Sequence, residues 1–241
     1  MKKSLPFIML LLRLFLFAAG GLLLSLITKN TLEQASRWWS SLCVVINIIT
    51  ILILLLVCKY EKIKFADLIR GNKAKASIKE ILLIIVAMII LGIGGMYGFG
   101  FLIYGHVPVT MIQPIPIWLA IVNFVLLPVS VVFAEMPLYF GYCLPKIESI
   151  TKSKHIAFIC PILFYALQHS FIPLIFDWKH ILFRFLSFLP LMCVLGIWYY
   201  KKRKLIPLMV GHIILDFATG FQILLVSIFP IMFEMMSEMS K

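Results

Sequence analysis

Seven long apolar stretches, separated by short polar segments, organise this chain. Most of them approach or exceed about 18 residues, the length that indicates a membrane-spanning helix. We therefore predict an all-α polytopic bundle of about seven spans, which forms a single integral membrane domain over residues 1–241. The predicted spans are 5–28, 42–58, 81–104, 115–144, 156–175, 181–200 and 205–233.

The fourth and seventh stretches are longer than a bilayer requires, so their helices are expected to tilt or break. Pro128 and Pro137 in the fourth and Pro230 in the seventh are candidate break points. A split of the seventh near Gly220 would give eight crossings. The first stretch has the basic start of a signal peptide, but it continues to Thr28, and we expect it to be retained as a helix.

The composition excludes a water-soluble globule. The chain is 63% hydrophobic and only 13% charged, with a mean hydropathy of +1.08, whereas soluble domains are about half apolar and a quarter charged. The five cysteines include no CxxC pair, so neither a disulfide framework nor a zinc knuckle is indicated. No soluble domain is visible, so any chemistry is expected in or at the membrane.

The basic residues report topology rather than a nucleic-acid partner, although the net charge is +12. They fall in the short segments between spans and form no single patch with interleaved aromatic residues. Sixteen lie on the side of the N-terminus and four on the other, so the positive-inside rule predicts a cytoplasmic N-terminus. The remaining two lie inside spans: Arg184, expected to reach the outer interface, and Arg13, which has no assigned place.

Four further ionisable residues are embedded in the predicted spans: Glu135, His169, His212 and Asp216. At about 1.5 Å per helical residue, all four lie near the middle of a hydrocarbon layer about 30 Å thick. A charged group there costs roughly 2.5 to 3.5 kcal/mol, so such groups are expected to face one another or water. His212 and Asp216 share one helix face, as do Tyr165 and His169. The pattern predicts one polar cluster contributed by three helices.

These residue types permit three kinds of chemistry. A carboxylate beside an imidazole in a low-dielectric pocket can take a proton from water, which allows hydrolysis. Two nitrogens and two oxygens are also acceptable zinc ligands, although no HExxH-like pair lies on one helix. A proton or ion relay is the third kind. Composition and spacing do not choose among them.

Three short motifs, in order on separate spans, carry a resemblance. Residues 135–141 read EMPLYFG, residues 165–169 read YALQH and residues 212–216 read HIILD. They resemble the EExxxR, FxxxH and HxxxN motifs of the CPBP family of intramembrane proteases, which includes the CAAX prenyl endopeptidases and the Abi proteins linked to bacteriocin self-immunity. The motif-bearing core covers about residues 115–221.

The resemblance implies a role for each embedded residue. Glu135 would be the general base, His169 its partner in activating water, and His212 with Asp216 the electrostatic support for the oxyanion. The family leaves metal dependence open. A divalent metal such as zinc, if one is bound, would take Glu135, His169 and His212 as ligands.

The chain departs from the family pattern at four positions. Met136 stands in place of the second Glu, Phe140 in place of Arg, and Tyr165 in place of Phe. Losing both members of a buried ion pair leaves no orphan charge, so the fold can remain intact, but a required second Glu would make this chain a pseudoenzyme. Asp216 replaces Asn, and because an ionised carboxylate cannot donate to an oxyanion, we hypothesise that it pairs with protonated His212.

The sequence therefore favours an intramembrane peptidase that hydrolyses a membrane-associated peptide or protein substrate, with the lipid bilayer as its surroundings and no nucleic-acid partner. A catalytically degenerate member that acts as a membrane immunity or regulatory binding protein is the alternative. A transporter or proton pathway is disfavoured because no internal repeat is evident. The excess of lysine over arginine and the abundance of isoleucine are typical of an AT-rich bacterial genome, so a multi-pass protein of a bacterial cell membrane is expected.

Overall fold

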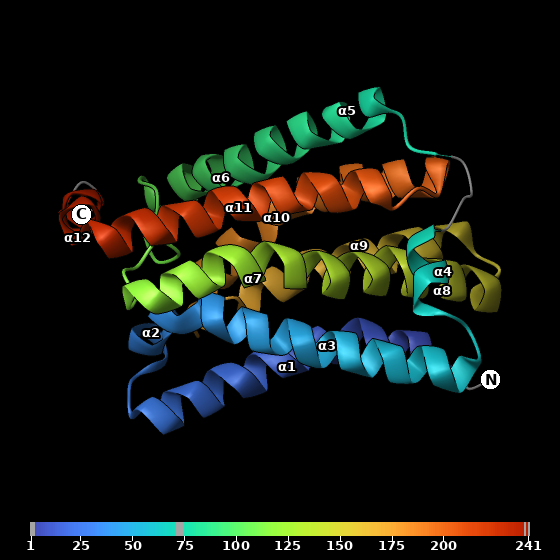
Figure 1. The fold of residues 1–241 in the computed structure, drawn as a ribbon, viewed down its shortest axis with the longest axis horizontal. Coiled ribbons are helices and arrows are strands. Elements are labelled where there is room, and N and C mark those ends of the chain that lie inside the picture. Colours follow the sequence, from blue (N-terminus) through green and yellow to red (C-terminus); the bar gives the residue numbers. More distant parts are fainter. Residues whose placement is uncertain (1–2, 71–74, 239, 241) are drawn as a thin grey trace.

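The computed structural model describes residues 3–70, 75–238 and 240 of the chain, and over these residues it forms helices and no strand. The long helices lie side by side with their axes in a common direction (Figure 1). This arrangement confirms the predicted all-α polytopic bundle. Six helical stretches are long and apolar enough to cross a membrane: α1 (Leu5–Thr28), α2 to α3 (Leu32–Glu61), α5 to α6 (Ile78–Tyr104), α7 to α8 (Ile117–Thr151), α10 (Trp178–Lys202) and α11 (Ile206–Ile228).

Several of these stretches change helical type along their length. Leu32–Glu61 comprises α2 (Leu32–Ala35), the 3₁₀ turn η1 (Ser36–Trp38) and α3 (Trp39–Glu61), and Ile78–Tyr104 comprises α5 (Ile78–Met88), the π-helical η2 (Ile89–Ile93) and α6 (Gly94–Tyr104). Ile117–Thr151 comprises α7 (Ile117–Met136), the π-helical η3 (Pro137–Cys143) and α8 (Leu144–Thr151). The shorter elements are α4 (Phe65–Arg70), α9 (Lys154–Gln168), the 3₁₀ turn η4 (His169–Phe171) and α12 (Pro230–Glu238).

The fifth crossing differs from the predicted span of residues 156–175. Its helix, α9, ends at Gln168 after 15 residues, and beyond η4 the chain from 172 to 177 is not helical. The carbonyls left at this end receive a donor from Arg184, whose Nε lies 3.3 Å from the His169 oxygen and 3.0 Å from the Ile172 oxygen. The prediction that Arg184 reaches the outer interface was therefore wrong. Its side chain is buried because unsatisfied carbonyls at membrane depth need donors from within the protein.

The seventh stretch breaks at Pro230 and not at Gly220. α11 continues unbroken to Ile228, and α12 begins at Pro230. Gly220 instead allows close helix packing, because a Cβ there would lie 3.3 Å from the Cα of Phe124 in α7. The split of this stretch that would have given an eighth crossing is therefore not found. In the fourth stretch Pro128 lies within α7, whereas Pro137 begins the π-helical segment.

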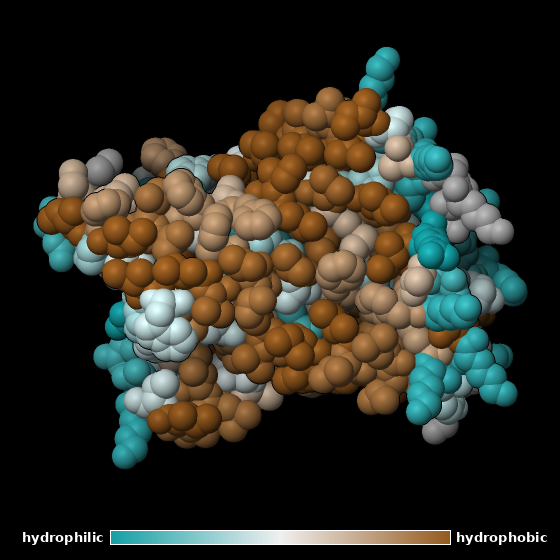
Figure 2. Space-filling view, viewed as in Figure 1, coloured by the Kyte–Doolittle hydropathy of each residue, from teal (hydrophilic) through white to brown (hydrophobic). Residues whose placement is uncertain are grey.

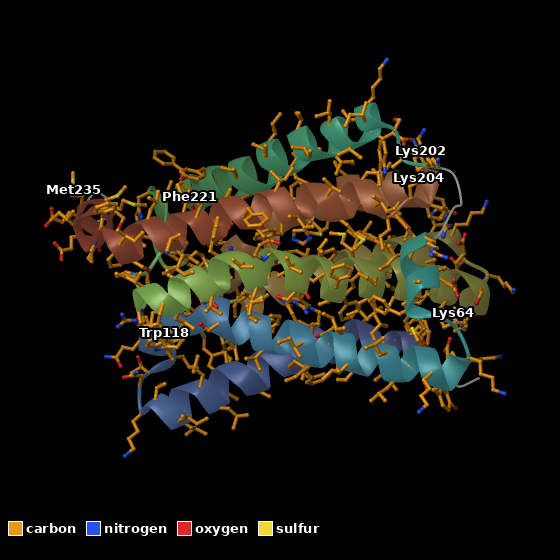
Figure 3. The ribbon with its side chains drawn as sticks, in the orientation of Figure 1. Lys64, Trp118, Lys202, Lys204, Phe221 and Met235 are labelled. Carbon is orange, nitrogen blue, oxygen red and sulfur yellow. The ribbon has the colours of Figure 1, made fainter. Side chains whose placement is uncertain are left out.

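Hydrophilic residues gather at the two ends of the bundle, and apolar residues cover the middle of the visible face (Figure 2). Lys64, Lys202 and Lys204 lie at the end where the N-terminus is found, which we call the basic end, whereas Trp118 and Met235 lie toward the opposite end (Figure 3). Ion pairs tie segments together at the basic end, namely Glu61 with Lys146, Glu148 with Arg203 and Glu80 with Lys204. Of the basic residues counted from the sequence, Lys2, Lys73 and Lys241 lie outside the described residues.

Candidate active site

Glu135 lies in the last turn of α7, directly before η3. Pro137, the first residue of η3, lacks a backbone N–H and cannot continue the α-helical hydrogen bonding. π-helical turns of this kind occur frequently at functional sites. The side chain of Glu135 is 3% exposed, so it faces the interior of the bundle.

A guanidinium from α1 neutralises this buried carboxylate. Arg13 is fully buried, and its Nη2 lies 2.7 Å from Oε1 of Glu135. Its Nε donates to Oε1 of Gln168 at 2.6 Å, and its Nη1 donates to Oδ1 of Asn47 at 2.9 Å and to Oγ1 of Thr50 at 3.2 Å. Arg13 therefore has a partner for each nitrogen and joins α1, α3, α7 and α9 around Glu135.

The two carboxylate oxygens of Glu135 have different surroundings. Oε1 accepts from Arg13 and also from Nε2 of Gln168 at 2.8 Å. Oε2 is buried and has no hydrogen-bond partner among the described residues. One oxygen is thus fixed in place, while the other is available to a further donor, as buried polar atoms require.

The free oxygen of Glu135 faces the imidazole of His212. Nε2 of His212 lies 3.8 Å from Oε2 of Glu135 and 3.3 Å from Oδ2 of Asp216. The other ring nitrogen, Nδ1, lies 3.4 Å from the hydroxyl of Tyr165, which accepts from it when the ring is protonated and donates to it when Nδ1 carries no proton. The imidazole is therefore held between two carboxylates on one side and a phenol on the other.

His169 occupies the junction at which α9 gives way to η4. Its Nδ1 donates to the carbonyl oxygen of Tyr165 at 2.8 Å, and its ring stacks on Phe188 with centroids 3.9 Å apart. Because a carbonyl only accepts, this bond places the proton on Nδ1 and leaves Nε2 as the accepting nitrogen. These contacts fix the orientation of the imidazole ring.

All four predicted residues, Glu135, His169, His212 and Asp216, line one cavity of about 140 Å³. Water occupies about 30 Å³ per molecule in the liquid, so the cavity has room for several molecules. Besides these four residues, α10 supplies Arg184 and Phe188, while α3, η2, α6 and residues 107–112 complete the walls.

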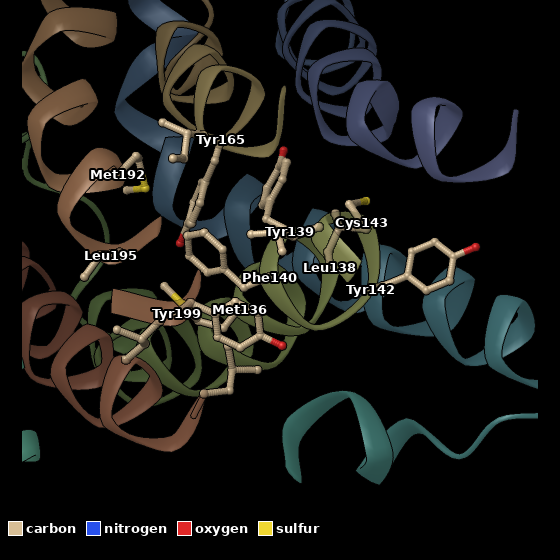
Figure 4. Close-up of a cluster of buried hydrophobic side chains, with 14 of the residues drawn as sticks. Met136, Leu138, Tyr139, Phe140, Tyr142, Cys143, Tyr165, Met192, Leu195 and Tyr199 are labelled. Atoms are coloured by element: carbon tan, nitrogen blue, oxygen red, sulfur yellow. The ribbon is translucent and has the colours of Figure 1, made fainter. Parts of the chain in front are cut away.

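A layer of aromatic and apolar side chains packs on the side of Glu135 that faces the basic end. Tyr139 and Tyr165 stack with centroids 4.5 Å apart, and Phe140 meets Tyr165 edge-on at 5.7 Å and Tyr199 at 5.6 Å. These side chains, which we call the aromatic layer, are at most 3% exposed. Figure 4 shows them packed together with Met136, Met192 and Leu195.

Comparison with known families identifies the segment that carries this site. Residues 115–218 match the model of the Rce1-like family, described as type II CAAX prenyl endopeptidase Rce1-like. Over this segment the chain is similar to the Rce1-like family. The matched segment is less than half of the chain and contains all four residues of the predicted cluster. Comparison with curated proteins and with solved structures gave no match.

The Rce1-like segment does not hold the whole site. Arg13 in α1 and Asn47 and Thr50 in α3 precede the matched residues, yet they make contacts within the cluster. Met136 and Phe140, which stand in place of the motif's second Glu and Arg, are fully buried among apolar neighbours. The positive charge beside Glu135 therefore comes from α1, outside the matched segment.

Sequence reasoning missed Arg13 and Gln168 as parts of the cluster. Arg13 was a charge inside an apolar stretch with no assigned place, and Gln168 was an uncharged polar residue directly before His169. Gln168 is fully buried and links Arg13, Glu135 and the hydroxyl of Tyr139. The signal for both was the cost of a polar group in an apolar helix, which demands a partner.

The arrangement does not fit a bound metal ion. Among the described residues, no group of three or more His, Cys, Asp and Glu side chains is placed to hold one. Oxygen Oε1 of Glu135 already contacts the guanidinium of Arg13 at 2.7 Å, so a resident positive charge lies where a cation would have to compete. Nδ1 of His169 is also occupied by the Tyr165 carbonyl.

Proposed function

We propose that this chain is an intramembrane peptidase that hydrolyses a peptide bond in a membrane-associated polypeptide, in a cell membrane with its N-terminus in the cytoplasm. The observation that carries the proposal is the difference in surroundings between the two carboxylate oxygens of Glu135. Oε1 is fixed by Arg13 and Gln168, while Oε2 accepts no hydrogen bond from the described residues and lies 3.8 Å from Nε2 of His212. A carboxylate held in this way is oriented to take a proton from water.

The charges of the cluster support a division of roles among the four residues. Arg13 and a protonated His212 together balance the two carboxylates of Glu135 and Asp216, which lie 3.8 and 3.3 Å from Nε2 of His212. In this state His212 carries the positive charge that an oxyanion needs, and Asp216 keeps that charge in place. This accounts for an Asp where the related motif has Asn.

The proposed reaction follows from these roles. Water held by the accepting Nε2 of His169 gives its proton to Oε2 of Glu135, and the hydroxide oxygen bonds to the carbonyl carbon. His212 stabilises the negative oxygen that forms. The C–N bond then breaks as the leaving nitrogen takes the proton from Glu135, which restores the carboxylate.

The decisive experiment compares Glu135→Gln with Glu234→Gln in the reconstituted protein. Both changes replace a carboxylate by an amide of the same shape, but Glu234 is exposed in α12 and touches no part of the cluster. Membrane proteins of the host are incubated with each variant, and new N-termini are identified by mass spectrometry. The variants are compared at equal amounts of folded protein. New termini that appear with wild type and Glu234→Gln, but are reduced about 10²- to 10⁴-fold with Glu135→Gln, support the proposal.

A second candidate function is a non-cleaving binding protein of the same family, such as an immunity or regulatory protein. It is favoured by Met136 and Phe140, which remove two charged groups of the first motif and are fully buried. In that case Glu135→Gln, at a matched amount of folded protein, would leave the cellular phenotype unchanged, and no new N-termini would appear with any variant.

A further inference from the structure

The cavity has a direction relative to the membrane. From Glu135 and His212 its walls continue along α11 through Thr219 and Gln222, and along residues 107–112 between α6 and α7, all toward the end opposite the basic end. The aromatic layer, none of whose residues lines the cavity, packs on its basic side. Because basic residues mark the cytoplasmic side, the open part of the cavity belongs to the outer half of the membrane.

The loop of residues 105–116 is fastened across the outer end of the cavity. Nε1 of Trp39 donates to the carbonyl of Met111 at 3.1 Å, and the backbone N–H of Ile115 donates to Oγ of Ser227 at 3.1 Å. Val107, Pro108 and residues 111 and 112 line the cavity from this loop. This loop therefore obstructs entry to the cavity along the bundle axis, and a substrate would have to enter laterally, between helices.

A seam between α6 and α11 lies beside the cavity. α5 packs against α11, but its continuation α6 packs against α10, where a Cβ on Gly95 would lie 2.2 Å from the Ser187 carbonyl. On the adjoining face of α6, a Cβ on Gly94 or Gly98 would meet nothing within 4 Å. Tyr97, between these glycines, lines the cavity and is 47% exposed.

The residues along the seam suit a polypeptide. Gln222 lines the cavity from α11, and its amide has no hydrogen-bond partner among the described residues, so it offers one donor group and one acceptor to a peptide bond. Ile93 and Leu215 supply apolar walls to the same cavity. Bare glycine backbone on α6 allows a chain to approach closely.

We propose that the substrate is a membrane-anchored polypeptide whose cleaved segment lies on the outer side, and that this segment reaches Glu135 through the seam between α6 and α11. The substrate class rests on the proposed peptidase function, whereas the route does not. The site would thus act on outward-facing juxtamembrane chain and not on cytoplasmic chain ends.

Thiol labelling in intact cells tests the route independently of any activity. Gln222→Cys and Thr219→Cys, made with Cys43→Ala because that thiol lines the same cavity, are exposed to a membrane-impermeant maleimide. The comparison variant is Ile214→Cys, a partly exposed site on α11 outside the cavity lining. We expect the cavity variants to be labelled from outside about tenfold faster than Ile214→Cys, because the thiol at 214 lies in an apolar environment and ionises poorly. Ile206→Cys, at the basic end of α11, is the control for membrane integrity. If the membranes are sealed, the maleimide labels it only in inverted vesicles.

Labelling of both cavity variants only in inverted vesicles, or from neither side, would overturn the route. A second arm separates the two proposals: one cleavable segment is fused to a single-span reporter in both orientations. Cleavage of only the outward-facing reporter supports the whole proposal, and cleavage of only the inward-facing one overturns the route. Labelling from outside without cleavage of either reporter would leave the route standing and remove the peptidase.

Discussion

The ion pair between Arg13 and Glu135 should be among the strongest couplings in this protein. Removing one partner of a buried ion pair costs about 3 to 5 kcal/mol in the free energy of unfolding, because an uncompensated charge stays inside. Arg13→Met leaves Oε1 of Glu135 with one donor, Gln168, in place of two. Arg13→Met and Glu135→Gln are each expected to destabilise strongly.

The double variant should be far less destabilised than the two single variants together. It has neither charge, and residue 135 as Gln can still bond to Gln168. We expect a coupling free energy of about 2 to 3 kcal/mol, measured from the unfolding equilibrium in detergent micelles or bicelles. Arg37→Met is the matched control: Arg37 is exposed and should shift stability by less than about 1 kcal/mol. Single effects that add to within about 0.5 kcal/mol would refute the proposed coupling.

Three further predictions concern packing and catalysis. Gly95→Ala should destabilise by about 1 to 3 kcal/mol because its Cβ would meet the α10 backbone, whereas Gly94→Ala, which meets nothing within 4 Å, should not; thermal unfolding distinguishes them. Phe140→Arg should lower the folded yield, since it adds a lone charge at a fully buried position; a folded, unchanged variant would show an unrecognised partner. His169→Ala should reduce cleavage without reducing folded yield, and undiminished cleavage would exclude its role in holding water.

Hydrophobic periodicity sufficed for the helical bundle, because the bilayer imposes length and apolarity on each crossing. The convergence of Glu135, His169, His212 and Asp216 on one cavity agrees with the argument that embedded ionisable groups avoid lipid. Their catalytic roles stay predictions. Local pattern could not locate the end of α9, because that end depends on a side chain from another helix, Arg184.

The contacts of Arg13 could not be predicted from the sequence for a related reason. Its partner Glu135 is 122 residues away, and no spacing rule connects two helices that meet only in the folded bundle. The predicted break near Gly220 failed because a glycine in a helix can serve close packing as well as flexibility. Pair contacts between distant helices are therefore the information that composition and periodicity lack.

The aromatic layer has a consequence for the cell as a whole. A water-filled hollow that reaches mid-depth shortens the insulating path across the membrane, and at this point the stacked rings of Tyr139 and Tyr165 with Phe140 supply much of what is left. Their tight packing then matters to ion homeostasis as well as to folding. A chain with a smaller side chain at 140 would be expected to leak protons, a cost that would fall on the organism even if peptide cleavage were untouched.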